Sequence, residues 1–305
     1  MATAGTADFA GPYDRAMGSD ANGRSLEFEI VRVLLDRGAG AAGNTLADQA
    51  RDAPKFAKCA AAVRNRHSAV APQVADWIEG RVGSFRHLRV ERMGDSAGGV
   101  ADLRMLRDGS PVLSVSIKFN HDALKHPRPY SLAQACGFDK GSPADEEHRA
   151  SLGAIAERFV AAARRFDCAT FSEIPKRTHA MYDEVVDACA ASLRRWLGSA
   201  GDGVGTALFD FLVPRGFHKV IVPRDPAGRV IVEDFTGIAV PTALQVRADG
   251  SYLDLRFDNS WHIRMRLHSA AKEINLDGGQ LSLKFDARKE SGEVPSRPIA
   301  PGSGR

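Results

Sequence analysis

Three short segments in the middle of the chain alternate apolar and polar residues, and this pattern constrains the fold more than any other. Residues 87–94, 100–106 and 111–119 each show the period of two that a half-buried strand requires. The four residues 107–110, Arg-Asp-Gly-Ser, separate the second segment from the third and are typical of a hairpin turn. The pattern predicts a β-meander at the centre of the chain.

Patterns on both sides of the meander indicate a mixed fold. Apolar residues at three- and four-residue steps predict helices, and alternating segments in the last third predict further strands. The expected helices cover 25–38, 45–67, 69–82, 145–166 and 180–198. The expected later strands cover 216–223, 229–235, 242–258 and 261–268. We therefore expect a mixed α/β (α+β) chain with a central mixed sheet flanked by helices.

The ends of the chain differ in composition from its middle. Residues 1–21 are rich in Ala, Gly and Asp, and residues 289–305 combine Pro, Gly, Ser and charge, so both are expected to be flexible tails. Between them we find no internal repeat and no long linker, which favours one domain over 22–288. The expected parts of this domain are 22–90, mainly helical; 91–128, the meander; 145–198, helical; and 205–288, mainly β.

Composition excludes several classes of protein. The 41 Lys and Arg residues against 38 Asp and Glu give a net charge of +3, which is too small to indicate nucleic-acid binding by itself. The four cysteines form no Cys-x-x-Cys pair, so neither a zinc site nor a disulfide framework is predicted. No run of 18 apolar residues and no signal-like start occur, so we expect a cytoplasmic protein without a membrane partner.

An aspartate and a lysine on consecutive strands of the meander predict a catalytic site. Ser116 and Lys118 share the polar face of their strand, because side chains alternate with period two. Asp102 can join that face only if it lies opposite an even-numbered residue such as Ser116, whereas a symmetric two-residue loop would place it opposite Val115. We therefore predict a three-residue loop, 108–110, or a β-bulge.

Carboxylates and a lysine are the groups that metal-dependent phosphodiester cleavage needs. Carboxylate oxygens hold Mg²⁺, and a lysine can orient or deprotonate the attacking water. An Asp followed by x-x-Lys on the next strand resembles the PD-(D/E)xK nuclease core, although Ser116 stands where that core has an acid. Taken alone, this motif is short and recurs often by accident.

Residues 118–128 make the resemblance more specific. They read Lys-x-Asn-His-x-x-x-Lys-His-x-Arg, a segment similar to one found in HaeIII-type type II restriction endonucleases. Residues 22–29, 96–104, 207–222, 260–274 and 281–288 also resemble segments of that family, in the same order and spacing. The resemblance extends from about Asn22 to Arg288.

The resemblance implies a restriction-endonuclease-like core that uses Mg²⁺ to cut both strands of a short palindrome, typically GGCC, leaving 5′-phosphates. Asp102 would bind the metal, the Ile117 carbonyl would complete its shell, and Lys118 would position the attacking water. Because Ser116 is not an acid, a third ligand must come from another element. The first candidate is Glu27 on the first helix, followed by Asp95 and Asp122.

The residues after Lys118 have the chemistry of a DNA-contacting segment. Cations bind phosphates, and Arg, Lys, Asn and His side chains can also read base edges. The candidates are Asn120, His121, Lys125, His126 and Arg128. A zinc site at the two histidines is disfavoured, because no Cys or His partners surround them.

Two alternatives to a restriction enzyme remain open. The same core could serve a repair or mobile-element nuclease, or, because of Ser116, a sequence-specific DNA-binding module without catalysis. The expected partner in each case is double-stranded DNA. A palindromic site is most simply cut by a two-fold homodimer, and a restriction enzyme is accompanied by a cognate DNA methyltransferase as its genetic partner.

Overall fold

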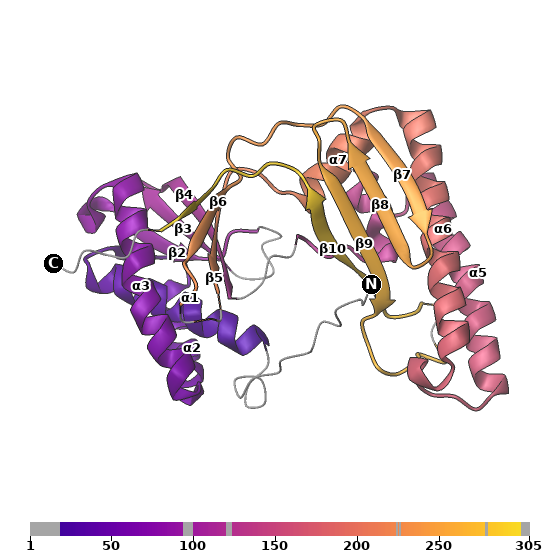
Figure 1. Cartoon of the computed structure of the whole chain (residues 1–305), viewed down its shortest axis with the longest axis horizontal. Coiled ribbons are helices and arrows are strands. Elements are labelled where there is room, and N and C mark those ends of the chain that lie inside the picture. The colour runs from indigo at the N-terminus through magenta and orange to yellow at the C-terminus, as the bar shows by residue number, and fades with distance from the viewer. Residues whose placement is uncertain are drawn as a thin grey trace, which may run out of the picture. The chain divides into compact units, whose positions relative to one another are not determined.

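The computed structural model describes residues 19–93, 100–119, 124–223, 225, 227–277 and 280–299. Over these residues it has seven α-helices, a seven-stranded mixed sheet and a four-stranded antiparallel sheet, which confirms the expected mixed α/β class (Figure 1). The chain folds into two compact units. Unit 1 is drawn from Met1–His121, Gly216–Gly237 and Val294–Arg305, and unit 2 from Asp122–Arg215 and Ile238–Glu293.

Unit 1 contains the predicted meander as the middle of the seven-stranded sheet. The strand order is β1-β2-β3-β4-β5-β6-β11, with parallel pairing in β1–β2 and β4–β5 and antiparallel pairing elsewhere. The helices are α1 (Ser19–Asp36), α2 (Thr45–Lys58) and α3 (Ala61–Val82). The strands are β1 (Gly40–Ala42), β2 (Arg89–Arg92), β3 (Leu103–Arg107), β4 (Ser110–Phe119), β5 (His218–Val222), β6 (Ile231–Asp234) and β11 (Ser296–Pro298).

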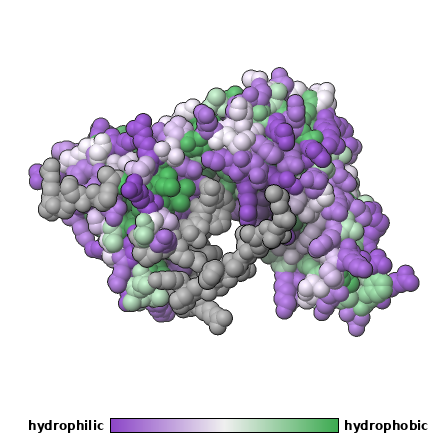
Figure 2. All heavy atoms as spheres, viewed as in Figure 1, coloured by the Kyte–Doolittle hydropathy of each residue, from purple (hydrophilic) through white to green (hydrophobic). Residues whose placement is uncertain are grey.

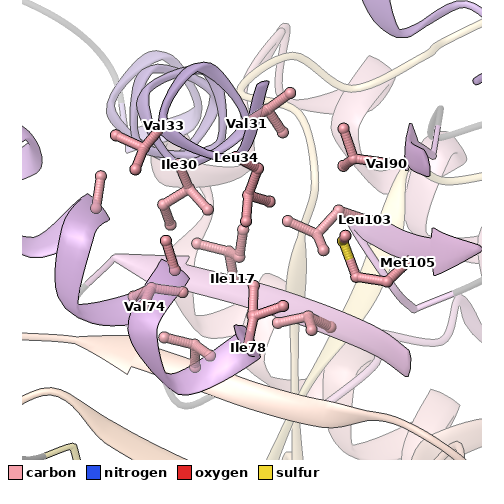
Figure 3. Packing of buried hydrophobic residues seen from close by; sticks show 14 of the residues in the cluster. Ile30, Val31, Val33, Leu34, Val74, Ile78, Val90, Leu103, Met105 and Ile117 are labelled. Carbon is pink, nitrogen blue, oxygen red and sulfur yellow. The ribbon is translucent and has the colours of Figure 1, made fainter. Parts of the chain in front are cut away.

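The core of unit 1 lies between this sheet and helices α1 and α3. Apolar residues three and four positions apart form one face of each helix, and in Figure 3 Leu34 of α1 and Ile78 of α3 point toward Ile117 of β4. All three side chains are buried. Burying one such side chain contributes about 1.5–3 kcal/mol. This packing fixes helix α1, and therefore Glu27, against the strands that carry Asp102 and Lys118.

The break between α2 and α3 lies earlier than predicted. We expected helices over 45–67 and 69–82, but the first helix ends at Lys58 and Cys59 has extended backbone. The side chain of Arg64, from the first turn of α3, donates to the carbonyls of Ala57 and Cys59 at this corner. A side-chain cap of this kind replaces the glycine or proline that would have marked the break in the sequence.

His67 on α3 is a buried histidine in an apolar setting. Its ring meets Phe119 edge-on at 5.2 Å and lies 6.5 Å from the ring of Phe56, and Nδ1 lies 3.2 Å from the Ser25 hydroxyl oxygen. Burial lowers the pKa of His67 to about 4, against a slight opposing effect of the Glu29 charge. The folded protein therefore holds this imidazole neutral.

The lowered pKa predicts a pH-dependent stability that belongs to His67. The contribution of the neutral His67 imidazole to the free energy of unfolding is fully present above the unfolded-state pKa of 6.5. It is lost as the pH falls toward 4, because over this range only the unfolded chain binds the proton. The wild type should lose about 3 kcal/mol more than His67→Phe over this window. Urea denaturation at a series of pH values measures the difference, and parallel curves for the two proteins would contradict it.

Unit 2 packs helices against one face of the antiparallel sheet. The sheet order is β10-β9-β8-β7. The helices are α4 (Leu132–Ala135), α5 (Pro143–Arg165), α6 (Pro175–Ala200) and α7 (Gly203–Leu212), and the strands are β7 (Leu244–Asp249), β8 (Tyr252–Phe257), β9 (His262–Ser269) and β10 (Leu283–Ser291). The ring of Phe209, from α7, meets the rings of Phe257 and Trp261 edge-on within this core.

Two boundaries and the number of compact units differ from the sequence analysis. The expected tail 289–305 contains the end of β10 and all of β11, which pairs with β6. Helix α7 occupies the start of the segment expected to be mainly β. The chain forms two compact units where we expected one domain. Among the described residues, none of the helices combines the length and the apolar character needed to cross a bilayer.

Candidate active site

Asp102 lies where the pairing of β3 with its two neighbours begins. Its backbone N–H donates to the carbonyl of Val115 in β4 at 2.8 Å, and its own carbonyl accepts from the Met93 amide, just after β2, at 3.0 Å. Both neighbouring strand segments therefore hold its main chain in place. A side chain on such a support is well positioned for precise chemistry.

Three donors from β4 converge on a single oxygen of the Asp102 carboxylate. Oδ2 accepts from the Ser116 hydroxyl at 3.0 Å, from the Ile117 amide at 2.5 Å and from the Lys118 ammonium at 3.2 Å. Within the described part of the chain, no donor bonds the other oxygen, Oδ1. The carboxylate is thus anchored by one oxygen and has the second left for a ligand.

A β-bulge in β4 brings these residues together. Met105 pairs with Leu113 and Leu106 with Pro111, so Val112 is the extra residue. The turn itself has two residues, Asp108 and Gly109, with φ of 51° and 81°, the conformation of a tight hairpin turn. The predicted bulge is confirmed and the alternative three-residue loop is wrong. The extra residue shifts the pairing by one, which places Asp102 beside Ser116.

The side chains of the site differ in how far they are exposed to solvent. The Ser116 side chain is fully buried, whereas those of Asp102 and Lys118 are 22% and 32% exposed. Ser116 therefore acts as an internal donor to Asp102, and the two charged groups remain accessible. A serine at this position holds the Asp102 carboxylate by a hydrogen bond but supplies no negative charge of its own.

Glu27 on α1 adds a second carboxylate to the surroundings of Asp102. Its side chain is 16% exposed. Burial raises the pKa of Glu27 to about 7, the negative charge of Asp102 adds to the rise, and Arg92 and Lys118 oppose it. The charges of both Asp102 and Lys118 therefore act on the Glu27 carboxylate, although no direct hydrogen bond joins Glu27 to either residue.

Arg92 at the end of β2 bridges two carboxylates beneath this site. Its buried guanidinium donates to Glu27 at 3.0 Å and lies 2.9 Å from Asp52, whose side chain is fully buried. Burial would raise the pKa of Asp52, but hydrogen bonds from Arg51 and Lys55 and the charge of Arg92 hold it well below its usual range. Arg92 therefore fixes the position of Glu27.

Sequence reasoning missed Arg92, although a signal was present. Along β2 and the residue before it, Leu88, Val90 and Arg92 share one parity, and the first two are core residues. A cation on the apolar face of a strand needs a buried anion as partner. Glu27 and Asp52, both in predicted helices, were the available partners.

The oxygen ligands of the site suit a hard divalent cation. Asp102 and Glu27 supply carboxylates, and the pKa of Glu27 is raised first by burial and then by the negative charge of Asp102, which a cation between them would offset. Among the described residues no group of three His, Cys, Asp or Glu side chains is placed to hold a metal ion. Asp95 and Asp122, the other proposed ligands, lie outside the described residues. The residues present fit Mg²⁺, which keeps several waters and needs few protein ligands.

The predicted DNA-contacting residues fall in a different part of the fold. Lys125, His126 and Arg128 belong to unit 2, whereas Asp102 and Lys118 belong to unit 1. The Lys125 ammonium lies 4.4 Å from the centre of the Phe211 ring, and His126 Nδ1 lies 3.5 Å from an Asp286 oxygen. Arg128 is exposed. The remaining two candidates, Asn120 and His121, lie outside the described residues.

Comparison with known proteins adds no further identification. Searches against protein-family models, curated proteins and solved structures find no match to this chain. The chemistry of the site is therefore the basis for a functional proposal. An anchored carboxylate, an adjacent lysine and a second carboxylate of raised pKa can bind a metal ion and orient a water molecule.

Proposed function

We propose that this chain is a Mg²⁺-dependent type II deoxyribonuclease that cuts both strands of a short palindromic site. The observation that carries the proposal is the convergence of Ser116, Ile117 and Lys118 on one oxygen of Asp102. The resemblance to HaeIII-type restriction endonucleases supports the substrate and suggests a GGCC-like site. Cleavage would leave 5′-phosphates, and the enzyme would act in the cytoplasm as part of a restriction-modification system.

Each residue of the cluster has a distinct role in this proposal. Asp102, through Oδ1, and Glu27 would hold Mg²⁺, with the Ile117 carbonyl as a further ligand. A bound Mg²⁺ supplies stabilisation of the charge that develops on the phosphate. Lys118 would orient the attacking water through its ammonium group, while Ser116 holds the Asp102 carboxylate in place. Glu27 thus supplies the acid that is missing at Ser116.

Cleavage of phage DNA by the purified chain with Mg²⁺ tests the proposal. Discrete fragments with 5′-phosphate ends are the expected result. A smear of fragments would instead favour a repair or mobile-element nuclease with the same core. Retention of DNA without cleavage would favour a DNA-binding module, for which the serine at position 116 is the supporting observation. The last two results would overturn the restriction activity.

Substitution of Glu27 separates metal binding from the later chemistry. Glu27→Gln keeps the size of the side chain and an acceptor for Arg92 but removes one negative charge. The Mg²⁺ concentration for half-maximal cleavage should rise by more than about tenfold, since even residues that only support a metal ligand cost that much. Asp36→Asn, on the exposed end of the same helix, is the matched control. Equal Mg²⁺ dependence in the two variants would remove Glu27 from the metal site.

A further inference from the structure

Within the described part of unit 2, the helices pack against one face of the sheet and leave the other face uncovered. Along β9, Ile263, Met265 and Leu267 are buried against the helices, while Arg264 and Arg266 alternate with them and face outward. Helix α6 packs along β7, β8 and β9 on the buried side. In the view of Figure 2, the part of the surface over β7–β10 of Figure 1 is mostly hydrophilic.

Arginines dominate the chemistry of this outer face. Its cations are Arg247, Arg256, Arg264, Arg266, Lys284 and Arg288. Its acids are Asp249, Asp254, Asp286 and Glu290. Most of these acids already have partners on the same face: Asp249 pairs with Arg264 at 2.9 Å, and Asp254 and Asp286 each lie 3.1 Å from a histidine nitrogen. Three of the four carboxylates therefore lie beside an arginine or a histidine of the same face.

Four exposed arginines on this face have no carboxylate partner among the described residues. They are Arg247, Arg256, Arg266 and Arg288. They line two hollows in pairs: Arg247 and Arg256 border one of about 290 Å³, beside Asp254. Arg266 and Arg288 border one of about 350 Å³, together with Arg264 and the carboxylates of Asp286 and Glu290. A guanidinium pair around a shallow hollow suits a phosphate group, because each guanidinium offers several donors in one plane.

The predicted basic segment borders the same face. The Phe285 amide of β10 donates to the Pro127 carbonyl at 2.9 Å, so this segment follows the edge of the sheet. His126 shares Asp286 with His268 of β9, at 3.5 Å and 3.1 Å. The exposed Arg128 follows directly in the chain. The basic segment and the outer face of the sheet therefore lie side by side within unit 2.

We propose that this outer face of the β7–β10 sheet binds the phosphodiester backbone of double-stranded DNA. The choice of DNA rests on the proposed nuclease function, while the anion-binding character rests on the arginines themselves. Unpaired guanidinium groups spread over several strands suit a repeating polyanion better than a single small anion. Contacts of this kind position a duplex without reading its sequence.

The test compares two sets of four substitutions in the full-length chain, without divalent metal so that no DNA is cut. The surface variant is Arg247→Gln, Arg256→Gln, Arg266→Gln and Arg288→Gln. The control variant removes four exposed cations on or beside α5 and α6, through Lys140→Gln, Arg158→Gln, Arg165→Gln and Lys176→Gln. Fluorescence anisotropy then measures binding of a labelled duplex at several salt concentrations between about 50 and 200 mM.

The two variants should differ in both affinity and salt dependence. Each lost phosphate contact lowers the slope of log K against log salt by about 0.9, so the surface variant should lose about 3 to 4 units of slope and more than about tenfold in affinity. The control variant should bind as the wild type does. Equal losses in the two variants, or no loss in the surface variant, would overturn the proposal.

Chemical protection and competition with other polyanions also test the surface. In the wild type, duplex DNA should protect the four arginines from modification by phenylglyoxal, as measured by mass spectrometry. This experiment does not depend on the folding of any variant. Tighter binding of heparin or single-stranded RNA than of duplex DNA would also overturn the proposal, because it would identify another polyanion. A wild type that binds DNA through this face without cutting would refute the nuclease and leave the surface in place. If the wild type cuts DNA and the surface variant binds DNA with unchanged affinity, the nuclease function stands and the proposed DNA-binding surface is refuted.

Discussion

Replacing Lys118 with alanine is expected to reduce DNA cleavage with Mg²⁺ by roughly 10²- to 10³-fold, the usual cost of removing one donor that stabilises charge in the transition state. The ammonium lies 3.2 Å from Asp102 Oδ2 and is one-third exposed, so it can reach both the proposed metal ligand and solvent. DNA affinity should hardly change, because the role of Lys118 is in the chemical step. Single-turnover cleavage and anisotropy measure the two effects separately.

The control for this substitution is Lys58→Ala at the exposed end of α2 in the same unit. It removes the same side chain without touching the Asp102 cluster and should cut at the wild-type rate. Removing Lys118 leaves Asp102 with the Ser116 and Ile117 donors, so the carboxylate should keep its position. Cleavage by Lys118→Ala at a rate close to that of the control would remove this lysine from the mechanism.

Replacing Arg92 with alanine should be the most destabilising charge change near the site. The guanidinium is 3% exposed and pairs with Asp52, which is fully buried, and with Glu27. Breaking a buried ion pair costs about 3–5 kcal/mol. We expect the lower end, about 3 kcal/mol, because Glu27 can take up a proton and Asp52 keeps Arg51 and Lys55. Urea denaturation gives the difference in unfolding free energy.

Arg51→Ala is the matched control, since Arg51 pairs with the same Asp52 from a half-exposed position. An exposed partner of this kind contributes about 0–1 kcal/mol. Arg92→Lys keeps the charge but cannot reach both carboxylates in the same way, so its stability should lie between the wild type and Arg92→Ala. Similar losses for Arg92→Ala and Arg51→Ala would show that the bridge does not hold this part of unit 1 together.

Local patterns predicted the strands that carry the site. The alternation in 111–119 placed Ser116 and Lys118 on one face, and the parity of Asp102 required an irregularity that the structure supplies at Val112. The position of the bulge was not predictable, because it depends on a two-residue turn at Asp108 and Gly109 that fits the twist of the hairpin. The break between α2 and α3 was also missed, since the residue that caps it is an arginine, which is equally common in the interior of a helix.

Contacts between residues far apart in sequence could not be predicted from local patterns. Arg92 joins Glu27 and Asp52 across 65 and 40 positions of sequence, and no periodicity within one segment records such a contact. The chain also leaves unit 1 after residue 121 and returns at 216, which places Lys125, His126 and Arg128 in unit 2 although they follow Lys118 closely in sequence. Strand β11 is missed because its sequence, Ser-Arg-Pro, has the composition of a tail, and only its pairing with β6 defines it.

In the proposed function, the Asp102 cluster cleaves DNA with the help of Mg²⁺. The most direct measurement compares single-turnover cleavage by the wild type and by Asp102→Asn, purified side by side, with DNA affinity measured on the same samples. Asparagine keeps the size of the side chain but removes the charge that would hold the metal. We predict Mg²⁺-dependent cleavage by the wild type and loss of cleavage with retained binding in Asp102→Asn. Equal cleavage by both proteins, or none by either, would contradict the account.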